Sequence, residues 1–349
     1  MIANGSDKQI SKNFKLNFSS LSLKYEVFQY QNIFSMNLVP KHNCIIINPG
    51  YLTSLVITNN KFKSRYNYDL WNSKFESIKF LEAKIRRQGT RFRIFLDEFE
   101  NSNLSSEILL LINRLRVEGI RVENITQEYE RVYLKVPIVQ IENKWVASRD
   151  LTNLNVSPHI ETLKRLFDLL FVVLFFPFAL ILIVIGAFLV WLSSPGPILF
   201  KQRRVCKNDK TFNIYKLRTM THNPQCDGSH TIENDQRIFP VGKFLRKTKI
   251  DELPQLFNIL MGHMSLIGPR PERKEIVEKL DQENPYYELR HLIRPGITGW
   301  AQINDPTATP NQNFEKLEYD IFYIKNASFL LDLKIILKTI KIVLTQDSL

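Results

Sequence analysis

The chain has 349 residues, of which 44% are hydrophobic and 23% are charged, and its formal net charge is +12 at pH 7. This length is sufficient for two domains, and a single small core would not account for it. The positive charge indicates anionic partners, which include nucleic acid, anionic lipid and phosphorylated substrates. The three cysteines, Cys44, Cys206 and Cys226, lack the spacing of a disulfide framework or a zinc site, so we expect reduced thiols facing a cytosol.

Residues 1–20 are polar and lack the apolar stretch of a signal peptide, so we expect a flexible N-terminus. Strands are predicted at residues 44–47, 54–57, 92–96 and 120–125, and helices at residues 71–87 and 105–117. This alternation over residues 21–150 favours a small α/β domain with a mostly parallel sheet. A single glycine, Gly50, follows the first strand. It is a turn signal and not the fingerprint of a dinucleotide site, which favours a structural or regulatory role for the domain.

An apolar segment without charged or strongly polar residues runs from Leu169 to Leu192. As a straight helix, its 24 residues would span about 36 Å, which exceeds the ~30 Å hydrocarbon core of a bilayer. Basic residues lie on both flanks, beginning with Lys164 and Arg165 on the N-terminal side, and this pattern favours two ends on the cytoplasmic face. Pro177 would kink the helix. We therefore predict a re-entrant membrane helix, with a simple spanning helix as the alternative.

An acidic pair, Asp251 and Glu252, follows Thr248 at the spacing of a helix-opening cap. Apolar residues continue at helical spacing, at Leu253, Leu256, Phe257 and Leu260, before a natural stop at Gly262. An isolated acidic pair in a first helical turn would only match the helix dipole. Cations near this pair in sequence favour another interpretation, in which one carboxylate holds a metal ion and the other attacks phosphorus.

Four cations are candidates for binding substrate phosphates, namely Lys216, Arg218, Arg246 and Arg270. Residues 212–218 alternate like a strand, which would place Lys216 and Arg218 on the same face. The prolines on either side of Arg270 limit the backbone freedom that it would lose on binding. Guanidinium groups suit bidentate contacts with phosphate, so these cations around two carboxylates would suit a diphosphate substrate.

A turn-rich run later in the chain combines a cation, a hydroxyl and an aromatic ring. Its candidate nucleotide-binding residues are Arg294, Gly296, Thr298, Gly299 and Trp300. The same run would also make a tight turn with Trp300 in the core, and the residues alone favour neither interpretation.

The C-terminal segment is predicted to be an interfacial helix, with an ordinary amphipathic core helix as the alternative. Its basic side carries Lys334, Lys338 and Lys341, and its apolar side carries Ile336, Ile340, Val343 and Leu344. The three lysines fall within about 60° on a helical wheel, so they would face one medium together.

The motifs of the second half of the chain occur in a characteristic order. The first are Lys164-Arg165-x-x-Asp168, Ser194-Pro195-Gly196-Pro197, Phe200-Lys201-Gln202-x-Arg204 and Tyr215 to Met220. The later ones are Leu245 to Asn258, Met264 to Glu272, Arg294 to Gln302, Tyr319-Asp320-x-x-Tyr323 and Asp332 to Ile335. This order resembles the bacterial sugar transferase family, the monotopic polyprenyl-phosphate phosphoglycosyl transferases. More weakly, the N-terminal part resembles the Rossmann-like domain of the longer family members.

The resemblance implies a role for each motif. The family moves a phosphosugar from a UDP-sugar to polyprenyl phosphate through an aspartyl intermediate and releases UMP. Asp251 would be the nucleophile, Glu252 would help to hold Mg²⁺, and residues 294–300 would form the uridine-side turn. The cations that match positive positions around the phosphates are Arg218, Arg246 and Arg270. The membrane anchor would comprise Lys164, Arg165, Asp168 and Pro177.

The expected fold is an α+β membrane-associated catalytic domain over residues 161–349. It would contain one re-entrant or spanning helix at residues 169–192 and would follow a small Rossmann-like α/β domain at residues 21–150. The expected function is sugar-1-phosphate transfer from a UDP-sugar to undecaprenyl phosphate, as the first membrane step of exopolysaccharide, capsule or O-antigen (lipopolysaccharide) biosynthesis. The catalytic domain would face the cytoplasm at the bacterial inner membrane.

The expected partners are a UDP-sugar, polyprenyl phosphate and the lipid bilayer, together with a second copy of the chain in a homodimer. Nucleic acid is not an expected partner, because the apolar segment would have no purpose in a nucleic-acid-binding protein. The alternative function is that of a catalytically inactive membrane scaffold in a polysaccharide assembly complex. A scaffold would have no need for the acidic pair together with the arginines around it.

Overall fold

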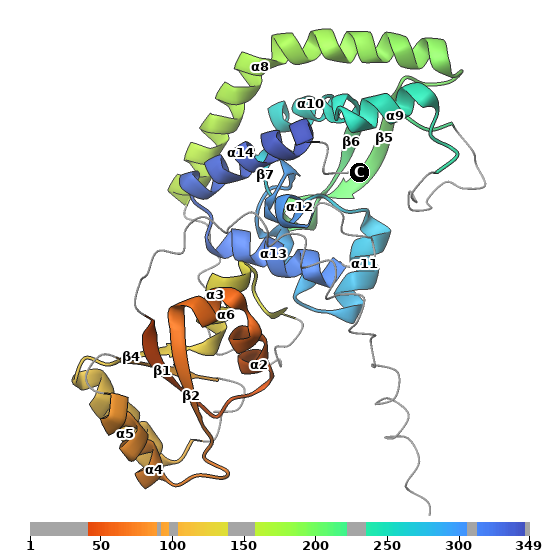
Figure 1. The fold of residues 1–349 in the computed structure, drawn as a ribbon. Coiled ribbons are helices and arrows are strands. Elements are labelled where there is room, and N and C mark those ends of the chain that lie inside the picture. Colours follow the sequence, from red (N-terminus) through yellow and green to blue (C-terminus); the bar gives the residue numbers. More distant parts are fainter. Residues whose placement is uncertain are drawn as a thin grey trace, which may run out of the picture.

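The computed structural model describes residues 41–88, 92–97, 104–138, 158–221, 235–305 and 313–345. The described residues form an N-terminal unit (residues 41–138) and a C-terminal unit (residues 158–345), which are drawn in orange to yellow and in green to blue (Figure 1). The predicted flexible N-terminus at residues 1–20 lies outside the described residues.

The N-terminal unit is built on a parallel sheet, which confirms the predicted sheet. Its strands are β1 (His42–Ile47), β2 (Tyr66–Trp71), β3 (Phe92–Leu96) and β4 (Arg121–Asn124), in the order β2-β1-β3-β4. Its helices are α2 (Tyr51–Thr58), α3 (Asn60–Arg65), α4 (Ile78–Gln88), α5 (Ser106–Val117) and α6 (Ile125–Tyr133). Side chains of β1 alternate between two buried faces, with Cys44 and Ile46 in one cluster and Ile45 and Ile47 in the other. The sheet is therefore covered by helices on both sides.

Three local predictions in this unit were wrong. Residues 54–57, predicted as a strand, lie in helix α2, because a short apolar run does not distinguish the two structures. Trp71 ends strand β2, so the helix predicted from this residue begins only at Ile78. The strand predicted to continue to Ile125 ends at Asn124, and the following residue opens helix α6, which was not predicted.

The C-terminal unit contains two small sheets and a set of short helices. Strands β5 (Leu199–Val205) and β6 (Thr211–Leu217) are antiparallel, and strands β7 (Ser265–Ile267) and β8 (Gly296–Thr298) are parallel. The shorter helices are α9 (Pro240–Lys247), α10 (Gln255–Leu260), α11 (Lys274–Glu283), α12 (Trp300–Asn304), α13 (Asn313–Lys325) and α14 (Phe329–Thr345). Three 3-10 turns, η4 (Lys207–Asp209), η6 (Ile250–Glu252) and η7 (Tyr287–Leu292), connect them. One apolar core around Tyr287, Trp300 and Tyr323 holds most of these elements, and a smaller cluster with Leu245 holds α9 and η6.

Helix α8 (Pro158–Ser193) opens this unit and is drawn as two arms with a bend between them (Figure 1). Pro177 lies inside it and removes a backbone hydrogen bond, which accounts for a bend. Its most apolar 18 residues have a mean hydropathy of 3.1, and within the described ranges no other helix is long and apolar enough to cross a membrane. Its buried residues follow a helical stripe, namely Asp168, Val172, Ala179, Ile183, Gly186 and Val190. The other sides of the helix are apolar and exposed.

Helix α6 and the residues after it join the two units. The amide of Val136 donates to the carbonyl of Glu318 at 3.0 Å. The ammonium of Lys325 lies 2.9 Å from the carboxylate of Glu130, and Lys135 pairs with the Glu318 carboxylate at 2.6 Å. We refer to these contacts as the α6 joint.

Candidate active site

Asp251 and Glu252 lie in the 3-10 turn η6, between helices α9 and α10. The predicted cap at Thr248 is wrong, because its hydroxyl donates back to the carbonyl of Phe244 at 2.9 Å and so closes the preceding helix. Lys249 then takes a left-handed conformation, with φ of 58°, which reverses the chain into the turn. The acidic pair is therefore held at a tight corner and not in the first turn of an α-helix.

The apolar stripe predicted after the pair is only partly buried. Leu256 lies in the core, but Phe257 and Leu260 are exposed, and Gln255 and Asn258 are buried in their place. Phe257 contacts the membrane-segment residue Phe176, with ring centroids 5.1 Å apart. The helical spacing was right, but α10 presents part of its apolar side to the surroundings of helix α8.

Glu252 is fixed by two cations. Its Oε1 accepts a hydrogen bond from Lys216 Nζ at 2.7 Å and another from Arg270 Nη2 at 2.9 Å. Burial alone would raise the pKa of Glu252, but Arg270 and Lys216 hold it well below its ordinary value. Glu252 is therefore charged across the whole range near neutral pH.

Asp251 differs from Glu252, because one of its carboxylate oxygens has no donor within the described part of the chain and its pKa is raised. It is 7% exposed, and its Oδ1 has no hydrogen-bond partner among the residues that the structure describes. Burial and the neighbouring Glu252 carboxylate raise the pKa of Asp251 to about 6, against the opposing charges of Lys216 and Arg246. At neutral pH this carboxylate is ionised and carries an oxygen without a donor, as a nucleophile requires.

Three of the four predicted phosphate-binding cations interact with the acidic pair, and the fourth, Arg218, does not. Lys216 and Arg270 contact Glu252, and Arg246, whose Nε donates to Thr219 Oγ1 at 2.8 Å, interacts electrostatically with Asp251. Arg218 is 6% exposed and donates to the carbonyl of Pro195 at 2.7 Å, so it fixes the turn after helix α8. Strand β6 ends at Leu217, and the two cations that were predicted to share a face have different partners, Glu252 for Lys216 and the turn after helix α8 for Arg218.

The run at residues 294–300 supports the loop that carries Arg270. The amide of Gly268 donates to the carbonyl of Thr298, and the amide of Gly296 donates to the carbonyl of Pro269, both at 2.9 Å. A Cβ atom on Gly296 would lie 2.1 Å from the Gly268 nitrogen, so this close approach requires glycine. The run therefore sets the position of the Gly268–Arg270 backbone.

Trp300 belongs to the core, as the second of the two sequence interpretations has it. The residue is 1% exposed, its ring stacks on Phe322 at 5.7 Å, and its Nε1 donates to the carbonyl of Leu134 at 2.8 Å. The ring is thus not available to stack on a base. Arg294 donates to the carbonyl of Gly262, and Thr298 shares a hydrogen bond with Thr339, so neither contacts the acidic pair in this structure. Gly299 also packs closely, since a Cβ there would lie 2.2 Å from the carbonyl oxygen of Gly268.

The predicted anchor residues before the membrane segment all face protein. Lys164 donates to Tyr323 Oη at 2.6 Å and to Asp332 Oδ2 at 2.8 Å. Arg165 donates to the carbonyl of Ile259 at the end of α10, and Asp168 accepts from the amide of Leu266 in β7. These three side chains tie the first arm of α8 to α14, α10 and β7.

The acidic pair supplies the carboxylates of this site that could hold a divalent cation. Within the described parts of the chain, no group of three or more His, Cys, Asp or Glu side chains is placed to hold a metal. Mg²⁺ often uses only one or two carboxylates and takes its remaining ligands from substrate phosphates and water. The carboxylate of Glu252, which uses Oε1 for both cations, fits a Mg²⁺ ion that is shared with a phosphate substrate, and the unpartnered Oδ1 of Asp251 is left for attack.

The model of the bacterial sugar transferase family matches residues 159–346, which are more than half of the chain. The chain belongs to this family. The match begins at helix α8 and covers the acidic pair and every cation around it.

Characterised relatives share this part of the chain. The UDP-N-acetylgalactosamine-undecaprenyl-phosphate N-acetylgalactosaminephosphotransferase of Aeromonas hydrophila is 39% identical over 259 residues, 74% of this chain and 60% of the relative. The UDP-glucose:undecaprenyl-phosphate glucose-1-phosphate transferase of Klebsiella pneumoniae is 34% identical over 298 residues, 81% of this chain and 60% of the relative. This chain thus spans about three fifths of the length of these two relatives. The exopolysaccharide production protein PSS of Rhizobium leguminosarum bv. phaseoli is 40% identical over 200 residues, 53% of this chain and 96% of the relative.

The structure adds residues to the site of this family member that sequence reasoning did not single out. Arg290 is buried, donates from Nη2 to the carbonyl of Arg270 at 2.8 Å, and lies 2.9 Å from the carboxylate of Asp320. Gly186 lets the second arm of α8 approach Ile250, the residue before the nucleophile candidate. The motif Tyr319-Asp320 was a sequence signal for the contact between Arg290 and Asp320. A lone glycine in an apolar segment gave no signal for the contact between Gly186 and Ile250.

Proposed function

We propose that this chain transfers a sugar-1-phosphate from a UDP-sugar to undecaprenyl phosphate and releases UMP. Membership of the bacterial sugar transferase family supports the reaction class, and the two relatives that cover most of the chain bear names of this activity. The single observation that carries the proposal is Asp251, a buried carboxylate with one unpartnered oxygen, next to a charged Glu252 and three cations.

In the proposed first step, an Asp251 carboxylate oxygen forms a bond to the β-phosphorus of the UDP-sugar. The bond between that phosphorus and the bridging oxygen breaks, and UMP leaves with the electron pair. In the second step, a phosphate oxygen of undecaprenyl phosphate attacks the same phosphorus, and the carboxylate of Asp251 is released. Lys216, Arg246 and Arg270 offset the negative charge of the phosphates in both steps.

Glu252 contributes by position and charge. Lys216 and Arg270 hold its carboxylate ionised beside Asp251, where it would join the substrate phosphates in holding Mg²⁺. When bound, this ion would neutralise diphosphate charge that the cations leave uncompensated. Arg290 holds the backbone of Arg270 and so acts as a positioning residue for the Glu252 contact.

We also propose that helix α8 enters and leaves the membrane on one side, which is the cytoplasmic face of the bacterial inner membrane. A spanning helix would carry its ends to opposite faces of a hydrocarbon core of about 30 Å. Both arms of α8 instead contact the C-terminal unit, since Asp168 bonds to Leu266 and Val190 packs with Leu245. The re-entrant topology accounts for this, because the buried stripe would rest on protein while the other sides of the helix rest in lipid.

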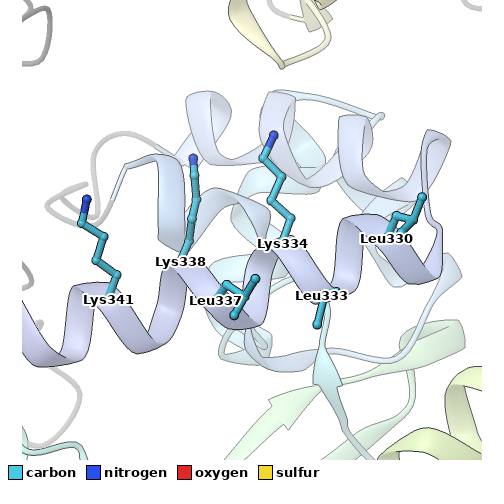
Figure 2. Close-up of a pocket in the computed structure, with 6 residues that line it drawn as sticks. All are labelled: Leu330, Leu333, Lys334, Leu337, Lys338 and Lys341. Carbon is cyan, nitrogen blue, oxygen red and sulfur yellow. The ribbon is translucent and has the colours of Figure 1, made fainter. Parts of the chain in front are cut away.

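Other helices supply apolar surface beside α8. Exposed apolar side chains are Phe244 on α9, Phe257 and Leu260 on α10, Met261 directly after it, and Phe329, Leu330, Leu337 and Leu344 on α14. Figure 2 shows the three lysines of α14 pointing to one side of the helix and Leu333 pointing to the other, while Leu330 and Leu337 lie beside the lysines on the same hollow surface. This arrangement supports the proposal that α14 lies in the membrane interface, with its leucines toward the acyl chains and its lysines toward polar surroundings. Lys334 and Lys338 also lie 5.3 and 5.6 Å from the Trp300 ring centroid.

The test is the release of UMP by purified protein in lipid nanodiscs. UDP-glucose, UDP-N-acetylgalactosamine and UDP-galactose are compared, with and without undecaprenyl phosphate, and transfer to the lipid is measured in parallel. We expect one donor to give UMP in step with lipid-linked product, and Asp251→Asn to give neither. An inactive scaffold would release no UMP from any donor, and that result would refute the proposal.

A further inference from the structure

At the carboxyl ends of the strands in the N-terminal unit, a side chain of the protein itself occupies the start of helix α2. In an open α/β sheet of this order, ligands bind outside the carboxyl ends of the strands, where a helix N-terminus attracts anions. Here the buried carboxylate of Asp97 accepts hydrogen bonds from the amide of Gly50 at 3.0 Å and from the hydroxyl of Thr53 at 2.7 Å. The start of helix α2 thus already has its anion.

A basic pocket lies at the opposite edge, where the strands begin. Its volume is about 430 Å³, and its lining residues are His42, Ser64, Arg65, Tyr66, Arg93, Arg121, Glu123 and Arg131. His42, Tyr66 and Arg121 are the first residues of β1, β2 and β4. Because the strands are parallel, their amino ends meet at one edge, and the sheet brings together cations that are distant in sequence.

The charges of this pocket are not balanced by its own residues. Glu123 is the one lining carboxylate, and it pairs with both Arg93 and Arg131. The side chains of Arg65 and Arg121 have no hydrogen bond or ion pair with any residue that the structure describes. Including the buried Glu128, which also pairs with Arg131 at 3.0 Å, two carboxylates therefore meet four guanidinium groups. The two unpaired ones come from different segments and converge on the same space.

We propose that this pocket binds a small molecule that carries a phosphate or diphosphate group. Guanidinium groups bind phosphate oxygens in bidentate pairs, and Arg65 and Arg121 have this capacity available. The volume is within the range of about 300–1,000 Å³ that is typical of small-molecule sites. Glu123 would hold the other two guanidinium groups in place, and the buried Tyr66 ring, with Arg93 over it at 5.8 Å, forms a firm wall.

This site is separate from the acidic pair, and its failure would leave the proposed transferase function intact. Arg131 lies in helix α6, next to Glu130, which pairs with Lys325 of the C-terminal unit. A ligand on Arg131 would therefore hold the same helix that makes the α6 joint. The amide groups of α6 and β4 are the natural place to detect it, because they are far in sequence from the catalytic turn.

The probe is inorganic pyrophosphate, added to the full chain in lipid nanodiscs without divalent metal. Hydrogen exchange is followed in peptides covering residues 121–133, and in peptides covering residues 250–252 to report separately on the catalytic turn. The pocket variant is Arg65→Gln with Arg121→Gln. The matched control is Arg86→Gln with Arg116→Gln, which removes the same charge from exposed positions of the same unit.

We expect pyrophosphate to slow exchange at residues 121–133 in the wild type and in the control variant. In the pocket variant, the concentration for half-maximal protection should rise by about tenfold or more, because two charge-assisted contacts are lost. Circular dichroism verifies that both variants are folded. Absence of protection at residues 121–133 in the wild type would overturn the proposal, and so would an equal loss in the control variant, which would indicate only a response to net charge.

Discussion

Substitution of Gly186 should lower turnover without detaching the protein from the membrane. This glycine lies on the buried stripe of α8, and an added Cβ would be 2.7 Å from Leu217 Cδ1 and 3.3 Å from Ile250 Cγ2. Carbon atoms in contact are normally about 3.5–4.0 Å apart, so the first contact is short by roughly 1 Å. Ile250 precedes Asp251, the proposed nucleophile, and an outward shift of α8 or of this turn would therefore move its carboxylate.

The size of the effect should depend on the size of the side chain. In Gly186→Ala, rotation of Leu217 can relieve much of the overlap, and we expect overpacking at the lower end of the usual roughly 1–3 kcal/mol. Gly186→Leu cannot be accommodated by rotation alone, because Leu217 and Leu245 are themselves buried. A displacement of about 1 Å at a reacting group can cost ~10²-fold in rate, so we expect losses of a few-fold for alanine and of ten- to a hundredfold, roughly, for leucine.

The assay is UMP release at saturating donor and lipid, with membrane partitioning and thermal unfolding measured on the same preparations. Ile185→Leu is the matched control, because Ile185 is exposed on a different side of α8 and its apolar character is kept. Partitioning should remain unchanged in all variants, since the exposed sides of the helix are not altered. Full turnover in a folded Gly186→Leu protein would show that the approach of α8 does not position the turn, and the reasoning would fail.

Four further outcomes follow from the site. Asp251→Asn should abolish UMP release. The wild type, incubated with UDP-sugar but without lipid acceptor, should show a hydroxylamine-sensitive adduct on Asp251 by mass spectrometry. An adduct on another residue would contradict the assignment of the nucleophile. EDTA should stop turnover and Mg²⁺ restore it, with Glu252→Gln needing more Mg²⁺; turnover that is indifferent to chelation would count against Glu252 as a ligand. Only ionised Asp251 can attack, and its pKa is raised to about 6, so UMP release should fall about tenfold per pH unit below that value. Arg246 lowers the pKa of Asp251, so Arg246→Gln should shift this acid limb of the pH profile to higher pH. A limb at the same pH would refute the electrostatic interaction between the two residues. Arg290→Lys keeps a charge beside Asp320 but loses the bond to the Arg270 carbonyl, so it should weaken donor binding more than turnover, as a KM-against-kcat comparison would reveal.

Local patterns were sufficient where one signal dominated. The strand at residues 92–96 and the helix predicted at residues 105–117 formed as expected, the helix with Ser105 as its cap, because such patterns are properties of short segments. The apolar segment was also correctly predicted to be a single long helix, since it is apolar throughout. Two of the four candidate phosphate-binding cations, Lys216 and Arg270, lie at the acidic pair, where both contact Glu252.

The errors arose where distant contacts decide the outcome. Thr248 has the spacing of a cap for the next helix, but the left-handed Lys249 directs the chain away, and the hydroxyl bonds backward. Arg218 looked equivalent to Lys216, yet the carbonyls of the Ser194–Pro195 turn, which precede it by more than twenty residues, take its guanidinium group. The acceptor of the Trp300 indole is Leu134, and no local pattern could have indicated a partner in the other unit.

The chain order of α8 bears on how this protein is made. Residues 158–193 leave the ribosome before strand β5 begins at Leu199, so the helix is complete before any strand of the C-terminal unit exists. At that moment the C-terminal elements that bury its apolar stripe do not yet exist, and insertion into a bilayer would remove all of its sides from water. Later elements would then meet a helix already in place, and Val172, Ile183 and Val190 would exchange lipid contacts for protein contacts as the unit assembles on it. In the proposed topology the membrane would therefore act during synthesis as a template for the C-terminal unit, and the approach of Gly186 to Ile250 would set the height of the turn that carries Asp251 above the bilayer.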